Sequence, residues 1–192
     1  MTTSELKQKL ITIYNNYVEA YDKISDQDYK AHLMNLGAGS ITPPKYKFFS
    51  TDYRDKFAEM AIKYRDEALA IIDDALDRIR IKKTEAPTTE AVNYLAMLKD
   101  KADISEHDIE DALSTYGDNY SAYNAIRSLA DSNEIRGVGI SDLDVLETEI
   151  RDNIIPVFNR FGVIDAENGH ATQAVVSMFE GIILGSLPEL VF

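Results

Sequence analysis

One stretch of the sequence decides the fold class. Residues 105 to 126 read SEHDIEDALSTYGDNYSAYNAI, in which apolar residues recur every three or four positions. This spacing places the apolar side chains on one side of an α-helix. Ser105 followed by Asp108 marks the start of that helix, because each side chain can accept a hydrogen bond from the backbone N–H of the other. The stretch therefore opens with a capped helix.

The middle of the same stretch predicts a turn between two helices. Gly117 suits the left-handed conformation that often ends a helix, and Asp118 or Asn119 can cap the helix that follows. We expect the hairpin to bury one side, which comprises Ile109, Leu113, Tyr116, Tyr120, Tyr123 and Ile126. Its candidate acidic face, turned to solvent, comprises Glu106, Glu110 and Asp111.

Helical periodicity extends over most of the chain. Thr2 with Glu5 can cap a first helix, and its apolar stripe comprises Leu10, Tyr14, Tyr17, Tyr21 and Ile24. Asp52 can cap a second, long helix that ends at about Lys83. No run of alternating β-branched residues competes with these stripes. We therefore predict an all-α fold, in which a helical coiled hairpin is followed by a multi-helix domain.

The long helix carries an apolar seam that predicts self-association. The shorter first helix leaves part of this seam uncovered, so the C-terminal part of the chain or another copy must pack there. The candidate self-association residues are Phe57, Met60, Tyr64, Ile71 and Ile79. We expect a homo-oligomer, whereas a C-terminal part folded back onto the seam would give a monomer.

Two breaks divide the predicted helices into domains. A linker at about residues 35–50 contains two glycines and two consecutive prolines, which cannot continue a helix. Pro87 stops the long helix, and Thr88 can cap the next one. These breaks predict an N-terminal helical region over residues 1–83 and a C-terminal helical domain over residues 84–192.

The C-terminal domain is predicted to end in two further segments. Ser141 with Asp144 can cap a helix that Pro156 kinks. The apolar positions of this helix are Leu143, Leu146, Ile150, Ile154 and Phe158. Residues 161 to 170 form a break, and the apolar segment from 171 to 187 is expected to be buried in the chain's own core or in a partner.

Negative charge is concentrated in the C-terminal domain. Residues 1–83 carry 14 Lys or Arg and 13 Asp or Glu, whereas residues 84–192 carry 6 and 20. This acidic field repels nucleic-acid phosphates and attracts basic protein surfaces. We therefore expect no direct nucleic-acid binding, and a basic protein partner if the acidity has a function. The other interpretation is that the acidity only keeps the chain in solution.

Composition also bears on the location of the chain. Cysteine is absent, which removes disulfides and thiolate sites and fits a reducing compartment. Charged residues interrupt the N-terminus, which therefore lacks the apolar core of a signal peptide. The apolar segment from 171 to 187 contains Glu180 and is shorter than the roughly 20 residues that a membrane helix needs. We expect a cytoplasmic protein without a membrane partner.

No residue pattern specifies a reaction. His107 and Asp108 lie in the polar first turn of a helix, where they are more typical of a solvated end than of a metal site. Asp73 and Asp77 place two carboxylates on one helix face, as in a magnesium-dependent nucleotide phosphohydrolase, but no matching acidic motif accompanies them. We therefore expect no enzyme, no cofactor and no catalytic or metal-binding residue, and keep a metal-dependent phosphohydrolase as an alternative.

The run AVNYLAMLKDKADISEHDIEDALSTYGDNYSAYNAIRSLA, together with the tyrosine-marked N-terminal helices, resembles small helical proteins encoded by phages and prophages of Gram-positive bacteria. The resemblance covers residues 50 to 135. It implies a virion-associated protein or an accessory protein that acts on host factors, in the virion or the host cytoplasm. The sequence thus predicts a non-enzymatic assembly or adaptor protein. The alternative is an acidic inhibitor that imitates nucleic acid and occupies a basic groove of a host enzyme.

Overall fold

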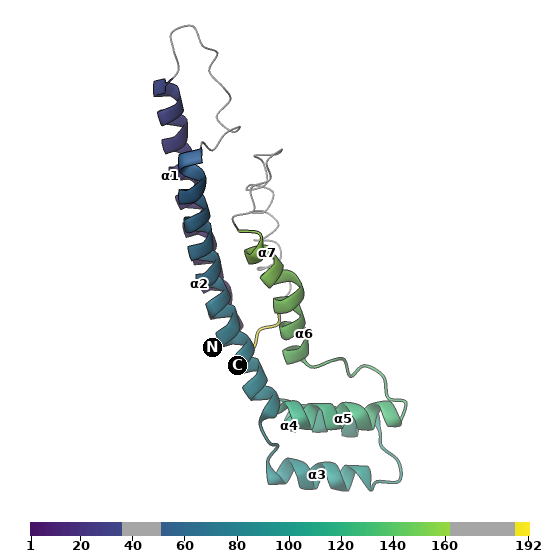
Figure 1. The fold of residues 1–192 in the computed structure, drawn as a ribbon. Helices are drawn as coiled ribbons and strands as arrows, with labels where there is room; N and C mark the ends of the chain where they lie inside the picture. The colour runs from purple at the N-terminus through teal and green to yellow at the C-terminus, as the bar shows by residue number, and fades with distance from the viewer. Residues whose placement is uncertain (36–50, 162–186) are drawn as a thin grey trace. The chain divides into compact units, whose positions relative to one another are not determined.

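The computed structural model describes residues 1–35, 51–161 and 187–192 (Figure 1). Helices account for 79% of these residues, which confirms the predicted all-α fold. Within the described residues, the β contact is an isolated antiparallel bridge between Thr2 and Val191.

Two predicted features lie mostly outside the described residues. Apart from its first residue, the predicted linker at residues 35–50 lies outside the described residues. The same holds for the apolar segment from 171 to 187, of which only Leu187 is described, and that residue is buried. Among the helices that the structure describes, none is long and apolar enough to cross a membrane.

The chain forms two compact units, each assembled from separate stretches of sequence. The three-helix unit comprises Met1–Thr2, Asp74–Thr148 and Pro188–Phe192. The hairpin unit comprises Thr3–Asp73 and Glu149–Leu187. The division by charge and helix breaks instead predicts one boundary at residue 84, which is where the long helix ends.

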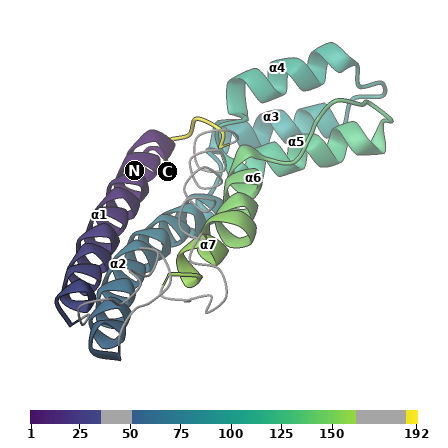
Figure 2. The same cartoon turned by 90° about the horizontal axis from the view of Figure 1, so that it is seen from above.

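The hairpin unit contains α1 (Thr3–Asn35) and the first part of α2 (Thr51–Thr84). Tyr17 meets the ring of Tyr64 edge-on at a centroid distance of 6.3 Å, and Tyr21 meets Phe57 at 5.4 Å. From Tyr17 to Tyr21 along α1, the contacted residue on α2 falls from Tyr64 to Phe57, so the two helices are antiparallel. Figure 1 and Figure 2 show them side by side over most of their lengths.

The apolar stripe predicted for the first helix is confirmed over its first half. Leu10, Tyr14 and Tyr17 are buried, whereas Tyr21 and Ile24 are half-buried. Leu6 and Ile13 are buried as well, although they were not part of the predicted stripe. The buried side of α1 is therefore wider than one residue per turn, as is usual for a helix that packs on a core.

The segment predicted as one kinked helix is a succession of three elements. They are α6 (Asp142–Glu149), the π-helical turn η1 (Ile150–Ile154) and α7 (Ile155–Asn159). Pro156 has no N–H and cannot bond the carbonyl four residues earlier, so the chain widens just before it. In the widened turn, the N–H of Ile155 donates to the carbonyl of Ile150.

The π-helical turn keeps four apolar residues on one side. Leu146, Ile150, Ile154 and Phe158 are all buried, and they are spaced four residues apart. In a regular α-helix, residues four apart drift around the axis by about 40° at each step. A wider turn holds more residues and reduces this drift. The predicted stripe is therefore confirmed, except that Leu143 is only half-buried.

Phe161 is the centre of an aromatic cluster in the hairpin unit. Its ring stacks on Tyr17 at a centroid distance of 4.0 Å with an interplanar angle of 16°. It also lies 6.0 Å from the ring of Tyr14 and 5.1 Å from that of Phe158. The sequence pattern assigned Phe161 to a break between helices, and its burial was not predicted.

The three-helix unit contains α3 (Thr89–Lys99), α4 (Glu106–Tyr116) and α5 (Tyr120–Ser132), which pack against one another (Figure 2). The caps predicted for these three helices are confirmed. Asp52, which was predicted to cap the long helix, instead lies inside α2, which begins at Thr51. The side chain of Thr88 accepts from the N–H of Ala91 at 3.1 Å, and Ser105 and Asp108 form a reciprocal capping box. Of the two candidates for the cap of α5, Asn119 is the one that accepts, from Ala122 at 3.0 Å.

Gly117 does not have the predicted left-handed conformation. Its φ is −64° and its ψ is −19°, which any residue can adopt. Glycine is needed here for space, because a Cβ atom at this position would lie 2.4 Å from the carbonyl oxygen of Leu113. The turn between α4 and α5 is therefore tight because the backbone approaches itself closely.

This close approach predicts the effect of adding a methyl group. We expect Gly117→Ala to lower the free energy of unfolding by roughly 1–3 kcal/mol, because the backbone at Leu113 must move. Gly139→Ala is the matched control, since nothing lies within 4 Å of its Cβ position. Urea denaturation followed by circular dichroism would compare the two variants. Equal stability of both would contradict the steric explanation.

Candidate functional site

The candidate acidic face lies on α4. The side chains of Glu106, Glu110 and Asp111 are all exposed, as predicted. On the opposite side of the helix, Ile109 and Ala112 are buried. The three carboxylates therefore share a helix whose apolar side is fixed to the core.

The core beneath α4 fixes the helix in place. It comprises the buried side chains of Leu98, Ile104, Ile109, Ala112, Ile126 and Ala130. Three alanines of this unit, Ala112, Ala122 and Ala130, are fully buried as well. The predicted buried side did not include these alanines. A short side chain at a buried position lets two helix backbones approach each other.

The start of α4 is held by a charged cap that is distinct from the acidic face. Asp108 accepts hydrogen bonds from the ammonium group of Lys101 at 2.6 Å and from the N–H of Ser105 at 2.9 Å. These bonds hold the pKa of the Asp108 carboxyl far below its ordinary value. Asp108 is thus a structural anion, whereas the neighbouring His107 is exposed and lies 3.5 Å from Asp111.

The predicted burial of the tyrosines is only partly right. Tyr116, Tyr120 and Tyr123 are half-buried, because each ring packs while its hydroxyl group reaches a polar atom. The hydroxyl of Tyr120 donates to Asp144 at 3.1 Å, and that of Tyr123 lies 3.5 Å from the carbonyl of Gly139. These tyrosines are therefore not fully buried, because their hydroxyl groups bond polar atoms near the surface.

Tyr116 connects α4 to α3. Its ring lies 5.2 Å from that of Tyr94, and its hydroxyl lies 3.5 Å from a carboxylate oxygen of Glu90. Partial burial and the charge of Glu90 raise the pKa of the Tyr116 hydroxyl. Tyr116 therefore stays neutral and remains a donor across the ordinary range of pH.

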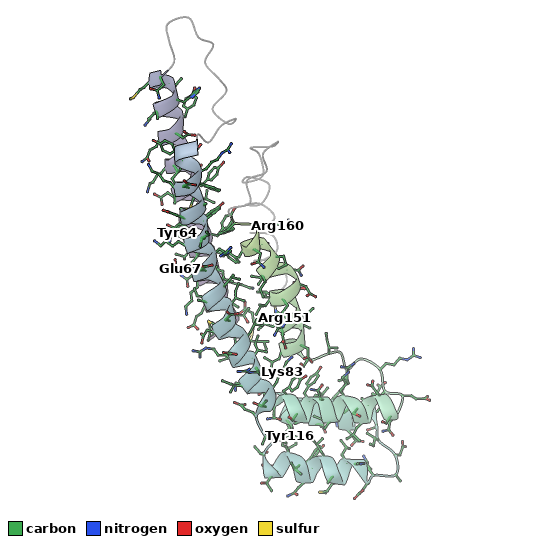
Figure 3. The ribbon with its side chains drawn as sticks, in the orientation of Figure 1. Tyr64, Glu67, Lys83, Tyr116, Arg151 and Arg160 are labelled. Atoms are coloured by element: carbon green, nitrogen blue, oxygen red, sulfur yellow. The ribbon has the colours of Figure 1, made fainter. Side chains whose placement is uncertain are left out.

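A second polar cluster, centred on Lys83, holds the end of α2 within the three-helix unit (Figure 3). The ammonium group of Lys83 lies 2.6 Å from a carboxylate oxygen of Glu147 and also bonds Asp144 at 2.5 Å. It lies 5.2 Å from the ring centroid of Tyr120 as well. Lys83 thus joins α2, α5 and α6, and only 18% of its side chain is exposed.

Hydrogen bonds decide the charges in the Lys83 cluster. Burial lowers the pKa of Lys83, but the bonds to Asp144 and Glu147 outweigh it and leave that pKa raised. Burial likewise raises the pKa of Asp144, but the bonds from Lys83, Ser141 and Tyr120 outweigh it and leave that pKa lowered. Lys83 and Asp144 are therefore charged over a wider range of pH than usual.

The sign of these shifts predicts how stability depends on pH. The contribution of Asp144 is complete above its ordinary pKa of 3.8 and is lost as the pH falls through its lowered folded value. The contribution of Lys83 is complete below its ordinary pKa of 10.5 and is lost as the pH rises through its raised folded value. We therefore expect a plateau of unfolding free energy between about pH 5 and pH 10.

Urea denaturation across this range tests the role of Asp144. Asp144→Asn should make the loss of stability in acid shallower, because the charge that acid removes is already gone. The exposed Asp100→Asn is the control and should keep the slope of the native chain. An acid slope that is the same in both variants would contradict a stabilising charge at Asp144.

The five candidate self-association residues differ in their exposure. Phe57 is 3% exposed and Ile79 is 0% exposed, so the chain itself already covers both. Met60, Tyr64 and Ile71 are half-buried. Only these three retain surface that a second molecule could cover.

The acidic residues weighed as metal ligands lie on an exposed helix face. Asp74 pairs with Arg78 at 2.9 Å, and Asp77 pairs with Arg80 at 3.1 Å. Among the residues that the structure describes, no group of three or more histidine, aspartate or glutamate side chains is placed to hold a metal ion. Asp74 and Asp77 therefore stand in ordinary ion pairs along α2, and Asp73 is exposed on the same helix.

Comparison with known proteins gives no relative from which a role for the acidic face or the α2 seam could be taken. No family model matches the chain, and neither the curated proteins nor the solved structures give a match.

Proposed function

We propose that this chain is a non-enzymatic helical adaptor or assembly protein. Its three-helix unit holds a basic protein partner, and its hairpin unit associates with another copy of the chain. The observation that carries the proposal is the acidic face of α4, on which Glu106, Glu110 and Asp111 are exposed while the other side of the helix is buried. A fixed carboxylate pattern can select a basic surface by its arrangement as well as by its charge.

The surrounding charge supports a basic partner. Residues 89–132, which span α3 to α5, carry nine Asp or Glu and three Lys or Arg, a net charge of −6. A field of this sign speeds the approach of a cationic protein and disfavours nucleic acid. The resemblance to phage and prophage proteins suggests a virion component or a host factor as the partner.

Affinity capture with a matched control tests the proposal. The test variant combines Glu106→Gln, Glu110→Gln and Asp111→Asn. The control combines Asp22→Asn, Asp55→Asn and Glu59→Gln, which removes three exposed charges from the hairpin unit instead. We expect proteins captured from a host lysate by the native chain to be retained by the control and reduced about tenfold with the test variant.

Two other outcomes would change the proposal. If both variants capture the same proteins as the native chain, the acidic face binds nothing and the acidity only aids solubility. If the captured protein is a nucleic-acid-binding enzyme and duplex DNA displaces it, the chain is an inhibitor that imitates nucleic acid. Both outcomes overturn the adaptor function, and mass spectrometry of the captured proteins separates them.

A further inference from the structure

The segment that joins α5 to α6 presents an arginine in an accessible stretch of backbone (Figure 1). Residues 135–141 lie outside the helices, and Arg136 and Gly137 are both exposed. Among the described residues, no backbone group from Arg136 to Ile140 bonds another backbone group. Proteases cut folded chains at exposed loops of this kind, because no helix has to unwind before the backbone enters an active site.

Both ends of this segment are fixed to the three-helix unit. The N–H of Ile135 donates to a carbonyl of α5 at 2.9 Å, and the side chains of Ile135 and Val138 pack against the core beneath α4. At the other end, Ser141 is buried and caps α6. The exposed pair Arg136 and Gly137 therefore stands out between two anchored positions.

Gly137 gives the exposed pair room to change conformation. Its φ is 105°, whereas enzymes that bind a peptide along its backbone hold it extended. Glycine adopts both conformations readily because it has no Cβ atom. No atom lies within 4 Å of the position that a Cβ would take at Gly137 or at Gly139. A local rearrangement therefore meets no neighbouring side chain.

The other basic residues in the described part of the chain are held more firmly. All except Lys101, Arg136 and Arg160 lie in α-helices or in the π-helical turn. The ammonium group of Lys101 bonds Asp108 at 2.6 Å, and its N–H donates to a carbonyl of α3. Arg160 is followed by Phe161, which is buried, so a cut there requires the aromatic cluster to open. Arg136 is the basic residue that a protease reaches without disturbing such contacts.

We propose that the bond between Arg136 and Gly137 is a cleavage site for an arginine-specific serine protease, which cuts the folded chain there. An acidic specificity pocket in such a protease accepts the arginine side chain. In the hydrolysis, the hydroxyl of a water molecule adds to the carbonyl carbon of Arg136 and its hydrogen to the nitrogen of Gly137. The products are a new carboxylate and a new amine. The inference does not depend on the proposed function, because neither the acidic face nor self-association takes part.

Contacts across the cut should keep the two fragments together. Within the three-helix unit, Lys83 and the hydroxyl of Tyr120 both bond Asp144, which lies beyond the cut. Within the hairpin unit, the ring of Tyr17 stacks on that of Phe161 at 4.0 Å. Each of these contacts joins the N-terminal fragment to the C-terminal one. The cut therefore removes the covalent link between α5 and α6 and leaves the packing of both units in place.

Brief digestion of the full chain with trypsin tests the site. We expect the cut after Arg136 to be about tenfold or more faster than cuts after Lys101 or Arg160, as read from fragment masses early in the digestion. Arg136→Gln should abolish this cut, whereas Arg54→Gln, which changes an exposed arginine within α2, should leave it unchanged. Cuts after Lys101 or Arg160 that are as fast as the one after Arg136 would overturn the proposal.

Digestion in about 1 M urea separates cleavage of the folded chain from cleavage after unfolding. A cut that requires global unfolding should become roughly tenfold faster, because urea raises the unfolded population. We expect the rate at Arg136 to stay the same once it is corrected for the activity of trypsin on a short arginine peptide. The two fragments should elute together in size-exclusion chromatography and separate only in denaturing urea. A rate that rises with urea, or fragments that separate without it, would contradict cleavage of an assembled chain.

Discussion

Replacing Phe161 with alanine should lower the free energy of unfolding by about 3–5 kcal/mol, the range expected when a buried aromatic ring is removed. The ring is 6% exposed and contacts three other aromatic rings, so its loss leaves a cavity that rigid neighbours cannot fill. For a chain of this length, the melting temperature should fall by about 10 °C. Thermal unfolding followed by circular dichroism would measure it.

Phe161→Leu is the control for this experiment. Leucine keeps most of the apolar volume but loses the stacking on Tyr17, so we expect a cost of roughly 1–2 kcal/mol. A loss of less than about 1 kcal/mol for Phe161→Ala would mean that the aromatic cluster is not packed in solution.

Replacing Lys83 with methionine should cost roughly 2–3 kcal/mol, because Asp144 and Glu147 then face each other without a cation. Methionine retains most of the apolar stem of lysine, so the loss reports mainly on charge. Lys82→Met is the matched control at the adjacent residue. Its partner Glu85 lies 3.2 Å away, but both side chains are at least 40% exposed, and we expect a loss of no more than about 0.5 kcal/mol.

Compensating substitutions separate charge from packing at Lys83. Combining Lys83→Met with Asp144→Asn and Glu147→Gln removes the repulsion between the two acids, and we expect it to recover part of the lost stability. Urea denaturation of the single and triple variants at neutral pH would show this. Equal losses for Lys83→Met and Lys82→Met would contradict the special role of Lys83.

The helix starts could be predicted because their signals are local. Thr88, Ser105 and Asn119 each cap a helix through the backbone N–H three residues further on, so a short window of sequence contains both partners. The acidic face follows from the same local information, since helix periodicity alone separates Glu110 from the buried Ile109.

Features that depend on distant residues could not be predicted in this way. Phe161 follows the last turn of α7, and only its contact with Tyr14 and Tyr17, more than a hundred positions away, makes it part of a core. Lys83 meets Asp144 at a separation of 61 residues, and a lysine near a helix end is ordinarily solvated. Neither position carries a local signal of its role.

The candidate surfaces were predictable to different degrees. Helix spacing found the seam of α2, but it could not decide which members the chain itself would cover. Tyr21 packs on Phe57, which is buried, whereas Tyr64 is only half-buried although it meets Tyr17. That outcome depends on the register between α1 and α2, which a single helical stripe does not fix.

The central claim is that the acidic face of α4 binds a basic protein, and the salt dependence of that binding tests it most directly. The affinity of the captured partner for the native chain would be measured by calorimetry from about 50 mM to about 300 mM salt. We predict that the dissociation constant rises about tenfold or more over this range, because added ions screen the contacts between exposed charges. A dissociation constant that stays the same would contradict the claim, since the binding surface would then be apolar and the acids would only keep the chain in solution.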